Sequence, residues 1–351
     1  RPQPDNGIYN VFDPHVWLEG DTYYAILGGR VKPWGRYDTA YLFDSNDLVH
    51  WRYLRPLYAP NTASTGPEED CACPDLFALG DRHVLLCISH ARGARAYIGR
   101  WQEGTFIPDR HQRLNWPGGS YFAPETLLDE QGRRVLFAWV VGQTRSSEPA
   151  PHELGVMALP RVLTPAADGS LGMAPIAELA ALRAETARLA ACALAENASQ
   201  ALPLGGQALE IAVEAVLEDD AVLALDVCCS PDGREATRIV VDRGAGTLAV
   251  DTSHSSLRTD ICRRYPVIMA VEDAQDVAVQ TAPLALAAGE RLQLRAFVDR
   301  SIVEVFANGR QAVTQRIYPT LADSTGVRLS CVHGAAQIAG AQVWRLRSLW
   351  E

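Results

Sequence analysis

Three proline-bearing segments recur in the first half of the chain, about 50 to 60 residues apart. Each leads into a stretch rich in aromatic or β-branched residues, then a tight turn, then a second such stretch. This period suits the four-stranded blade of a β-propeller, although a β-sandwich would show similar strands. The sequence therefore predicts an all-β fold for residues 1–170. The three segments are Phe12–Trp17, Cys73–Phe77 and Ala123–Leu127.

The rest of the chain divides into a linker and a second β domain. Residues 175–195 are rich in alanine, and their larger apolar residues recur at near-helical spacing, which predicts a helix within a linker over residues 171–203. About eight alternating strands follow over residues 204–351. They predict an antiparallel β-sandwich.

Length and charge exclude several classes of protein. A chain of 351 residues is long enough for two hydrophobic cores. The net charge of −10 argues against nucleic acid as a partner, because phosphate binding needs a basic surface. No apolar run approaches the roughly 20 residues that span a bilayer, so no membrane contact is expected.

Eight cysteines leave the state of the thiols open. Cys71-Ala72-Cys73 does not have the spacing of a zinc or redox pair, so we expect mainly buried free thiols, with a partial disulfide set or a metal as alternatives. Asn197-Ala198-Ser199 is a glycosylation sequon, and the chain begins at Arg1 without a methionine. Together these features favour a processed, secreted protein.

Carboxylates recur where the predicted blades begin. Asp13, Asp75 and Glu125 each lie beside a proline, which holds the backbone in a rigid corner, and Glu68-Glu69-Asp70 precedes the second segment. Singly, these residues are typical of turns and of a solvated acidic loop. Around a shared cavity, however, a pair of carboxylates is what glycoside cleavage requires, one as nucleophile and one as general acid.

Taken together, the segments resemble glycoside hydrolase family 32, which contains invertases, levanases, inulinases and fructosyltransferases. The match holds in order and spacing from one end of the chain to the other. Its most specific part is Phe297–Gly309, where Asp299 and Glu304 are expected to be structural. The other matching segments are Phe12–Arg30, Ser45–Trp51, Cys71–Phe77, Tyr121–Thr126 and Leu159–Thr164.

The resemblance implies a five-bladed β-propeller followed by a C-terminal β-sandwich. It also implies retaining cleavage or transfer of β-linked fructosyl units of sucrose, inulin or levan, with no metal or other cofactor. Asp13 takes the position of the family's transition-state stabiliser, and Ala72 takes that of its acid/base glutamate. The resemblance places Asp75, Tyr121, Glu125 and Trp51 at substrate-binding positions.

Three departures limit what the resemblance implies. The segment that holds the family's nucleophilic aspartate is absent and would lie upstream of Arg1, so the N-terminal blades are expected to be missing. Phe12 stands where the family has arginine. Ala72 cannot donate a proton, which leaves the general-acid position empty.

Several accounts of Ala72 remain open. The residue could mark an engineered variant, a naturally inactive relative, or a chain whose acid has shifted to Glu68, Glu69 or Asp70; Asp13 could also replace the nucleophile. The alternative function is therefore an inactive carbohydrate-binding relative. In that case a partner chain or a second copy would complete the propeller, and a fructose-containing saccharide would remain the ligand.

Overall fold

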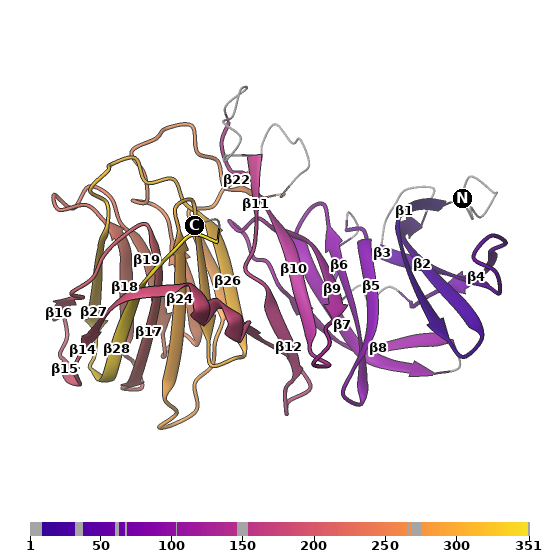
Figure 1. Ribbon diagram of the computed structural model, residues 1–351, viewed down its shortest axis with the longest axis horizontal. Coiled ribbons are helices and arrows are strands. Elements are labelled where there is room, and N and C mark those ends of the chain that lie inside the picture. The colour runs from indigo at the N-terminus through magenta and orange to yellow at the C-terminus, as the bar shows by residue number, and fades with distance from the viewer. Residues whose placement is uncertain are drawn as a thin grey trace.

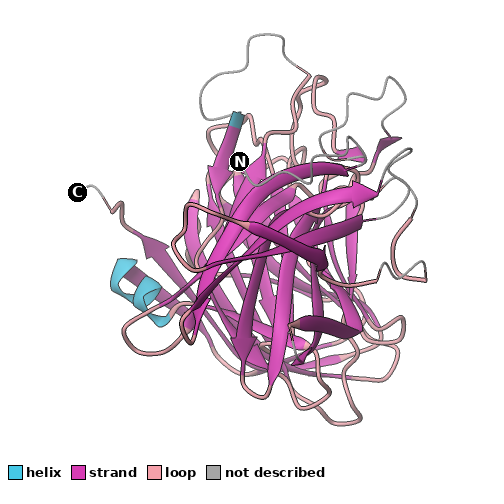
Figure 2. Ribbon diagram, turned by 90° about the vertical axis from the view of Figure 1, so that its right-hand side faces the viewer, coloured by secondary structure: helices cyan, strands magenta, loops and turns pink. Residues whose placement is uncertain are grey.

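The computed structural model describes residues 9–31, 38–59, 63–66, 69–102, 104–145, 154–265, 267 and 275–349. Within them nearly all regular structure is β-strand, as Figure 2 shows. Three sheets form the N-terminal part of the molecule, and two larger sheets packed face to face form the C-terminal part (Figure 1). The predicted all-β class, with propeller-type sheets followed by a sandwich, is confirmed.

The three N-terminal sheets are antiparallel and follow one another along the chain. The first consists of β1 (Tyr9–Glu19), β2 (Thr22–Val31), β3 (Asp38–Ser45) and β4 (Arg52–Pro56). The second consists of β5 (Ala72–Leu79), β6 (Arg82–Ser89), β7 (Gly93–Gln102) and β8 (Thr105–Arg113). The third consists of β9 (Tyr121–Leu128), β10 (Arg134–Val141), β11 (Gly155–Met157), β12 (Arg161–Pro165) and β13 (Leu171–Pro175). The total of five blades stays a prediction.

The first strand of each sheet carries the same irregularity. Asp13, Cys73 and Ala123 have positive φ angles of 20°, 44° and 46°, and the register of pairing shifts at each of them. Each residue precedes a proline. Because proline has no backbone N–H, the strand pairing can be interrupted there without leaving an N–H group unpaired. A positive φ costs a residue with a side chain about 1 to 2 kcal/mol. This repeated bulge is the structural basis of the repeat seen in the sequence.

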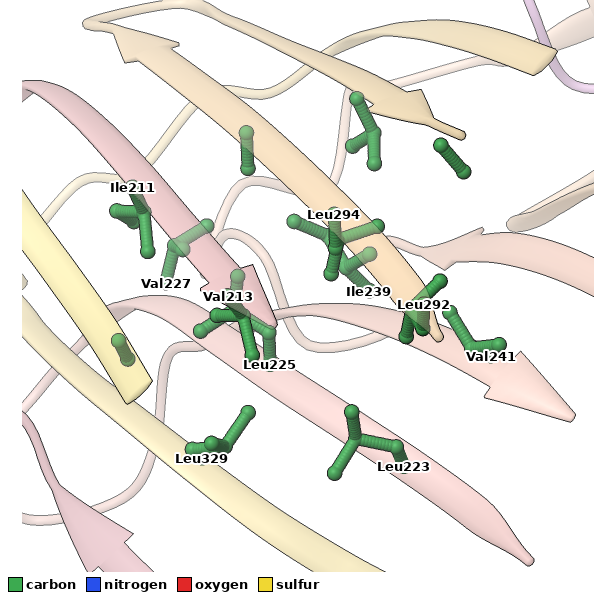
Figure 3. Packing of buried hydrophobic residues seen from close by; sticks show 14 of the residues in the cluster. Ile211, Val213, Leu223, Leu225, Val227, Ile239, Val241, Leu292, Leu294 and Leu329 are labelled. Atoms are coloured by element: carbon green, nitrogen blue, oxygen red, sulfur yellow. The ribbon is translucent and has the colours of Figure 1, made fainter. Parts of the chain in front are cut away.

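The C-terminal sandwich buries its apolar side chains between a seven-stranded and a six-stranded sheet. Figure 3 shows Ile211 and Val213 beside Leu225 and Val227, which come from the opposite sheet. The larger sheet contains β14 (Arg183–Leu189), β15 (Cys192–Leu194), β17 (Ala208–Leu217), β24 (Leu292–Asp299), β25 (Ile302–Ala307), β26 (Gln311–Arg316) and β28 (Ala336–Leu346). The smaller sheet contains β16 (Ser199–Ala201), β18 (Val222–Cys229), β19 (Thr237–Asp242), β20 (Thr247–Asp251), β23 (Val279–Pro283) and β27 (Gly326–His333). A separate pair consists of β21 (Arg264–Tyr265) and β22 (Gln275–Asp276).

The predicted linker helix over residues 175–195 is wrong. The segment forms a short 3-10 helix, η1 (Ala177–Leu182), beside the end of the chain (Figure 2), and then the strands β14 and β15, which pair with β28. Ala187 and Leu189, two residues apart, both pack against the sandwich core, so the apolar period is that of a strand. Pairing with an open sheet edge therefore outweighs the helical propensity of the alanines.

A buried ion pair joins the two parts of the molecule. Arg161 of β12 donates to Glu304 Oε2 of β25 over 2.7 Å and also to Thr314, while Glu304 Oε1 accepts from the backbone N–H of Leu159. Both charged side chains have at most 2% exposure. The expected structural role of Glu304 is confirmed.

The structure also shows the state of the cysteines and the character of the helices. All eight cysteines are free, which confirms the expectation of unpaired thiols. Among the described residues, none of the helices has the length and apolar character that crossing a membrane requires.

Candidate active site

The repeated bulge brings one residue from each N-terminal sheet to a common point. His15 of β1, Asp75 of β5 and Glu125 of β9 each follow the proline of their segment directly. One ring nitrogen or carboxylate oxygen of each lies within 4.8 Å of the other two. Because a bulge re-aims the side chains that follow it, three similar bulges in neighbouring strands direct these residues toward one another.

Asp75 is the fixed member of this cluster. Its side chain has no solvent exposure, and its Oδ2 accepts from the backbone N–H and the hydroxyl of Thr126 over 2.8 and 2.6 Å. Its Oδ1 lies 3.4 Å from Nδ1 of His15. Burial lowers the pKa of His15, although the charge of Asp75 opposes the shift. His15 therefore presents a neutral ring to the carboxylate at neutral pH.

Asp13 lies at the bulge itself and remains exposed. Its Oδ2 accepts from the backbone N–H of Cys73 over 3.3 Å and from the Cys73 thiol over 3.5 Å. Burial, and then the negative charge of Asp13, raise the pKa of Cys73 to about 12. The thiol consequently stays protonated and acts as a donor to Asp13, not as a nucleophile.

Glu125 is the carboxyl group best suited to proton transfer. The protein around it withdraws water from its carboxyl, and the charges of Asp75 and Asp13 add to this effect, so that its pKa rises to about 7. The side chain is nevertheless open to solvent on one side. A carboxyl group that titrates near neutral pH can both donate and accept a proton, as a general acid must.

Two of the three alternative acids predicted from the sequence are buried and bound by other side chains. Glu69 is 2% exposed, and its carboxylate is bound by Arg92 over 2.7 Å and by Arg95, which argues against proton donation. Asp70 is fully buried and bound to His90. Glu68 lies outside the described residues.

Ala72 is buried among apolar side chains. It is 1% exposed and belongs to an apolar cluster that includes Phe77 and Phe122. A glutamate here would place its carboxyl group among apolar side chains unless the cluster opened. The position that the resemblance assigns to the general acid is thus buried among apolar side chains and lacks a carboxyl group.

Two of the predicted substrate-binding residues serve the packing of the sheets. Tyr121 is 1% exposed, with the guanidinium of Arg161 4.3 Å from the centre of its ring. Trp51 packs against the apolar cluster around Tyr41 and Phe43, and its indole N–H donates to the backbone oxygen of Leu48. The structure therefore brings Asp75 and Glu125 together, whereas Tyr121 and Trp51 take part in packing.

An aromatic cavity adjoins the cluster and was not predicted. It has a volume of about 520 Å³ and is lined by His15, Trp17 and Trp101, among others. Trp17 stacks on Tyr24 at 5.6 Å between ring centres and meets Trp101 edge to face at 5.8 Å. Exposed aromatic faces of this kind pack well against sugar rings. The sequence signal that could have identified His15 as a site residue is its position directly after Pro14, the first of the repeated prolines.

Comparison with known proteins covers both parts of the molecule. Residues 1–175 match the glycosyl hydrolases family 32 N-terminal domain, and residues 178–345 match the family 32 C-terminal domain. A sucrose-6-phosphate hydrolase of Escherichia coli is 27% identical over 98% of this chain and 68% of its own length. A raffinose invertase of Escherichia coli is 28% identical with the same coverage. The chain thus spans about two thirds of the length of these relatives.

Solved structures agree on the fold. Fructan 1-exohydrolase IIa of Cichorium intybus has a TM-score of 0.81 at 19% identity, over 99% of this chain and 75% of that one. Exo-inulinase of Aspergillus awamori has a TM-score of 0.79 at 18% identity, over 100% of this chain and 70% of that one. Since the family matches extend over nearly all of the sequence, this chain belongs to glycosyl hydrolase family 32.

Proposed function

We propose that this chain acts on β-fructosyl linkages as a glycoside hydrolase, supplying a transition-state stabiliser and a proton donor; retaining cleavage also requires a nucleophile, which must be a further carboxylate. Relatives named as sucrose-6-phosphate hydrolase and raffinose invertase support this activity, as do structural neighbours named as fructan exohydrolase and exo-inulinase. The observation that carries the proposal is the convergence of Asp75 and Glu125 on His15, which lines an open aromatic cavity, with the charge of Asp13 acting on Glu125. Fructose-containing saccharides are accordingly the proposed substrates.

Asp13 is the proposed transition-state stabiliser. Its carboxylate is exposed, and the donors of Cys73 hold it in one orientation, so it can accept hydrogen bonds from hydroxyls of a fructosyl ring. Such bonds strengthen as positive charge develops on the ring in an oxocarbenium-like transition state. Asp75 accepts two hydrogen bonds from Thr126 and so links β5 to β9, the strand that carries Glu125.

Glu125 is the proposed proton donor. Ala72 has no ionisable group, and Glu69 is neutralised by two arginines. Glu125 keeps a substantial protonated fraction at neutral pH because its pKa is about 7. General acid catalysis of this kind contributes roughly 10²- to 10⁴-fold to a rate.

The test is release of fructose by the purified chain from sucrose, sucrose 6-phosphate, raffinose, inulin and levan, followed by chromatography. We expect release from at least one substrate, and a loss of at least about 100-fold in Asp13→Asn and Glu125→Gln. An activated fructoside with a good leaving group needs no acid, so it should restore turnover in Glu125→Gln but not in Asp13→Asn. Turnover that both variants retain would contradict the assignment.

The closed packing around Ala72 favours a second candidate, a saccharide-binding relative without turnover. Calorimetric titration with sucrose and inulin distinguishes the two. Binding without fructose release, removed by Asp13→Asn, would establish the second candidate. Release of fructose by the unmodified chain would exclude it.

A further inference from the structure

The cluster formed by His15, Asp75 and Glu125 has the composition of a metal site. Imidazole nitrogen with two carboxylates suits divalent ions of the zinc and manganese type. The three ligand atoms come from three different sheets and lie within 4.8 Å of one another. Three ligands at about 2.1 Å from one ion stand roughly 3.0 to 3.4 Å apart, and His15 Nδ1 and Asp75 Oδ1 already lie 3.4 Å apart.

A second observation points to a missing ligand at the same place. Oδ1 of Asp75 is buried and has no hydrogen-bond donor among the described residues, whereas Oδ2 of the same carboxylate has two. Buried carboxylate oxygens are normally paired, because losing water without a partner is costly. The unpaired oxygen faces His15, and hence the centre of the cluster.

The setting of the ligands supports an ion at this point. His15 is partly buried, and its Nδ1 lies 3.4 Å from Oδ1 of Asp75. The carboxylates of Asp13, Asp75 and Glu125 interact electrostatically, and Arg134 is the cation that acts on His15 and Asp75. A divalent ion would neutralise the excess negative charge of these carboxylates once Glu125 releases its proton. Glu125 is open on one side, which provides a path for entry and room for water ligands.

We propose that His15, Asp75 and Glu125 bind one divalent transition-metal ion where the first strands of the three N-terminal sheets meet. The ion would tie together β1, β5 and β9, which near this point are also joined by the hydrogen bonds of Asp13 to Cys73 and of Asp75 to Thr126. The resemblance to family 32 implies no metal, so this site is a property of these three residues in this chain. An ion bound to Glu125 would hold its carboxylate deprotonated and so prevent the proposed proton donation, and binding of the ion is therefore measured directly and without substrate.

The experiment uses the full chain, freed of metal by dialysis against a chelator. Calorimetric titration with zinc chloride should show one ion per chain, with weaker binding of manganese and much weaker binding of magnesium. Manganese electron paramagnetic resonance should show the bound ion directly. His15→Ala and Glu125→Gln should each weaken zinc binding at least about tenfold.

A matched control is available on the sandwich. His333 also lies near two carboxylates, with Nδ1 3.6 Å from Glu196 and Nε2 3.4 Å from Asp220, but it is 54% exposed. His333→Ala should leave the one-ion stoichiometry and the affinity unchanged. Absence of zinc binding, or binding that His15→Ala and Glu125→Gln leave intact, would overturn the proposal. Circular dichroism checks the fold, and Glu125→Gln, an isosteric change at an open side chain, decides the matter if His15→Ala misfolds.

Discussion

The propeller sheets and the sandwich use similar strands for opposite purposes. In the sandwich, the facing sides of two sheets enclose Leu, Ile and Val side chains. In the propeller part, the first strand of each sheet is bent by a bulge at a residue with positive φ, and it directs polar side chains to a shared point. The strained backbone therefore marks the candidate site, because such strain persists only where the surrounding structure enforces it.

The junction between the two parts should show the largest effect. Glu304→Gln leaves the buried guanidinium of Arg161 without a counter-ion, so the free energy of unfolding should fall by about 3 to 5 kcal/mol in denaturant titrations. The control is Glu185→Gln, which breaks the exposed pair with Arg345 and should cost at most about 1 kcal/mol. Equal costs would show that the junction is no more important than a surface pair.

Restoring the family's acid should be the next largest effect. Ala72→Glu places a carboxyl group in an apolar cluster, so we expect a loss of about 1 to 3 kcal/mol in stability. Ala193→Glu puts the same side chain on an exposed strand position and should change stability by less than about 0.5 kcal/mol. A stable Ala72→Glu protein with new or greater turnover would show that the cluster opens, and would move the acid back to the family position.

A substitution of Asp13, at the bulge of β1, should change the affinity for ligands more than the stability. Asp13→Asn keeps the shape of an exposed side chain, and asparagine tolerates a positive φ, so the melting temperature should hardly change. Affinity for fructosides should nevertheless fall at least about tenfold, measured by calorimetry. If stability falls and binding does not, the bulge is a structural feature and not part of the site.

The smallest effect is a pH dependence of stability. The pKa of Glu125 is raised from 4.5 to about 7 on folding, so between these values the folded chain holds more protons than the unfolded chain. This contribution to stability therefore declines as pH rises from about 4.5 to about 7. At pH 5 the melting temperature of Glu125→Gln should be close to that of the wild type. At pH 8 the variant should melt at a higher temperature relative to the wild type than it does at pH 5. A constant difference between the two proteins across this range would rule out the shifted titration.

Much of the fold was accessible from the sequence because it depends on local chemistry. Prolines, turn residues and β-branched stretches predicted the strands and the rigid corners, and in the structure the same prolines follow the three bulged residues. The helix predicted over residues 175–195 failed because an open edge at β28 provided strand pairing that no local pattern reveals. Propensity is a weak guide wherever a partner strand is available.

The candidate site was only partly accessible. The position of Asp13, Asp75 and Glu125 beside prolines indicates a role in the site. Glu69 and Tyr121 are instead buried against Arg95 and Arg161, which are distant in sequence, so their packing cannot be read from the local pattern. His15 was overlooked as a site residue, because a single histidine after Asp-Pro has no special meaning without its neighbours.

By itself, the sequence determined the all-β class, the repeated proline corners, the family and the absence of a carboxyl group at Ala72, since these follow from residue identity and spacing. Only the tertiary structure decided which carboxylates meet, that Glu125 titrates near neutral pH, and that Asp75 keeps an unpaired oxygen. The physical reason is that burial and electrostatic interactions depend on distances between strands 50 to 60 residues apart, which no local pattern specifies.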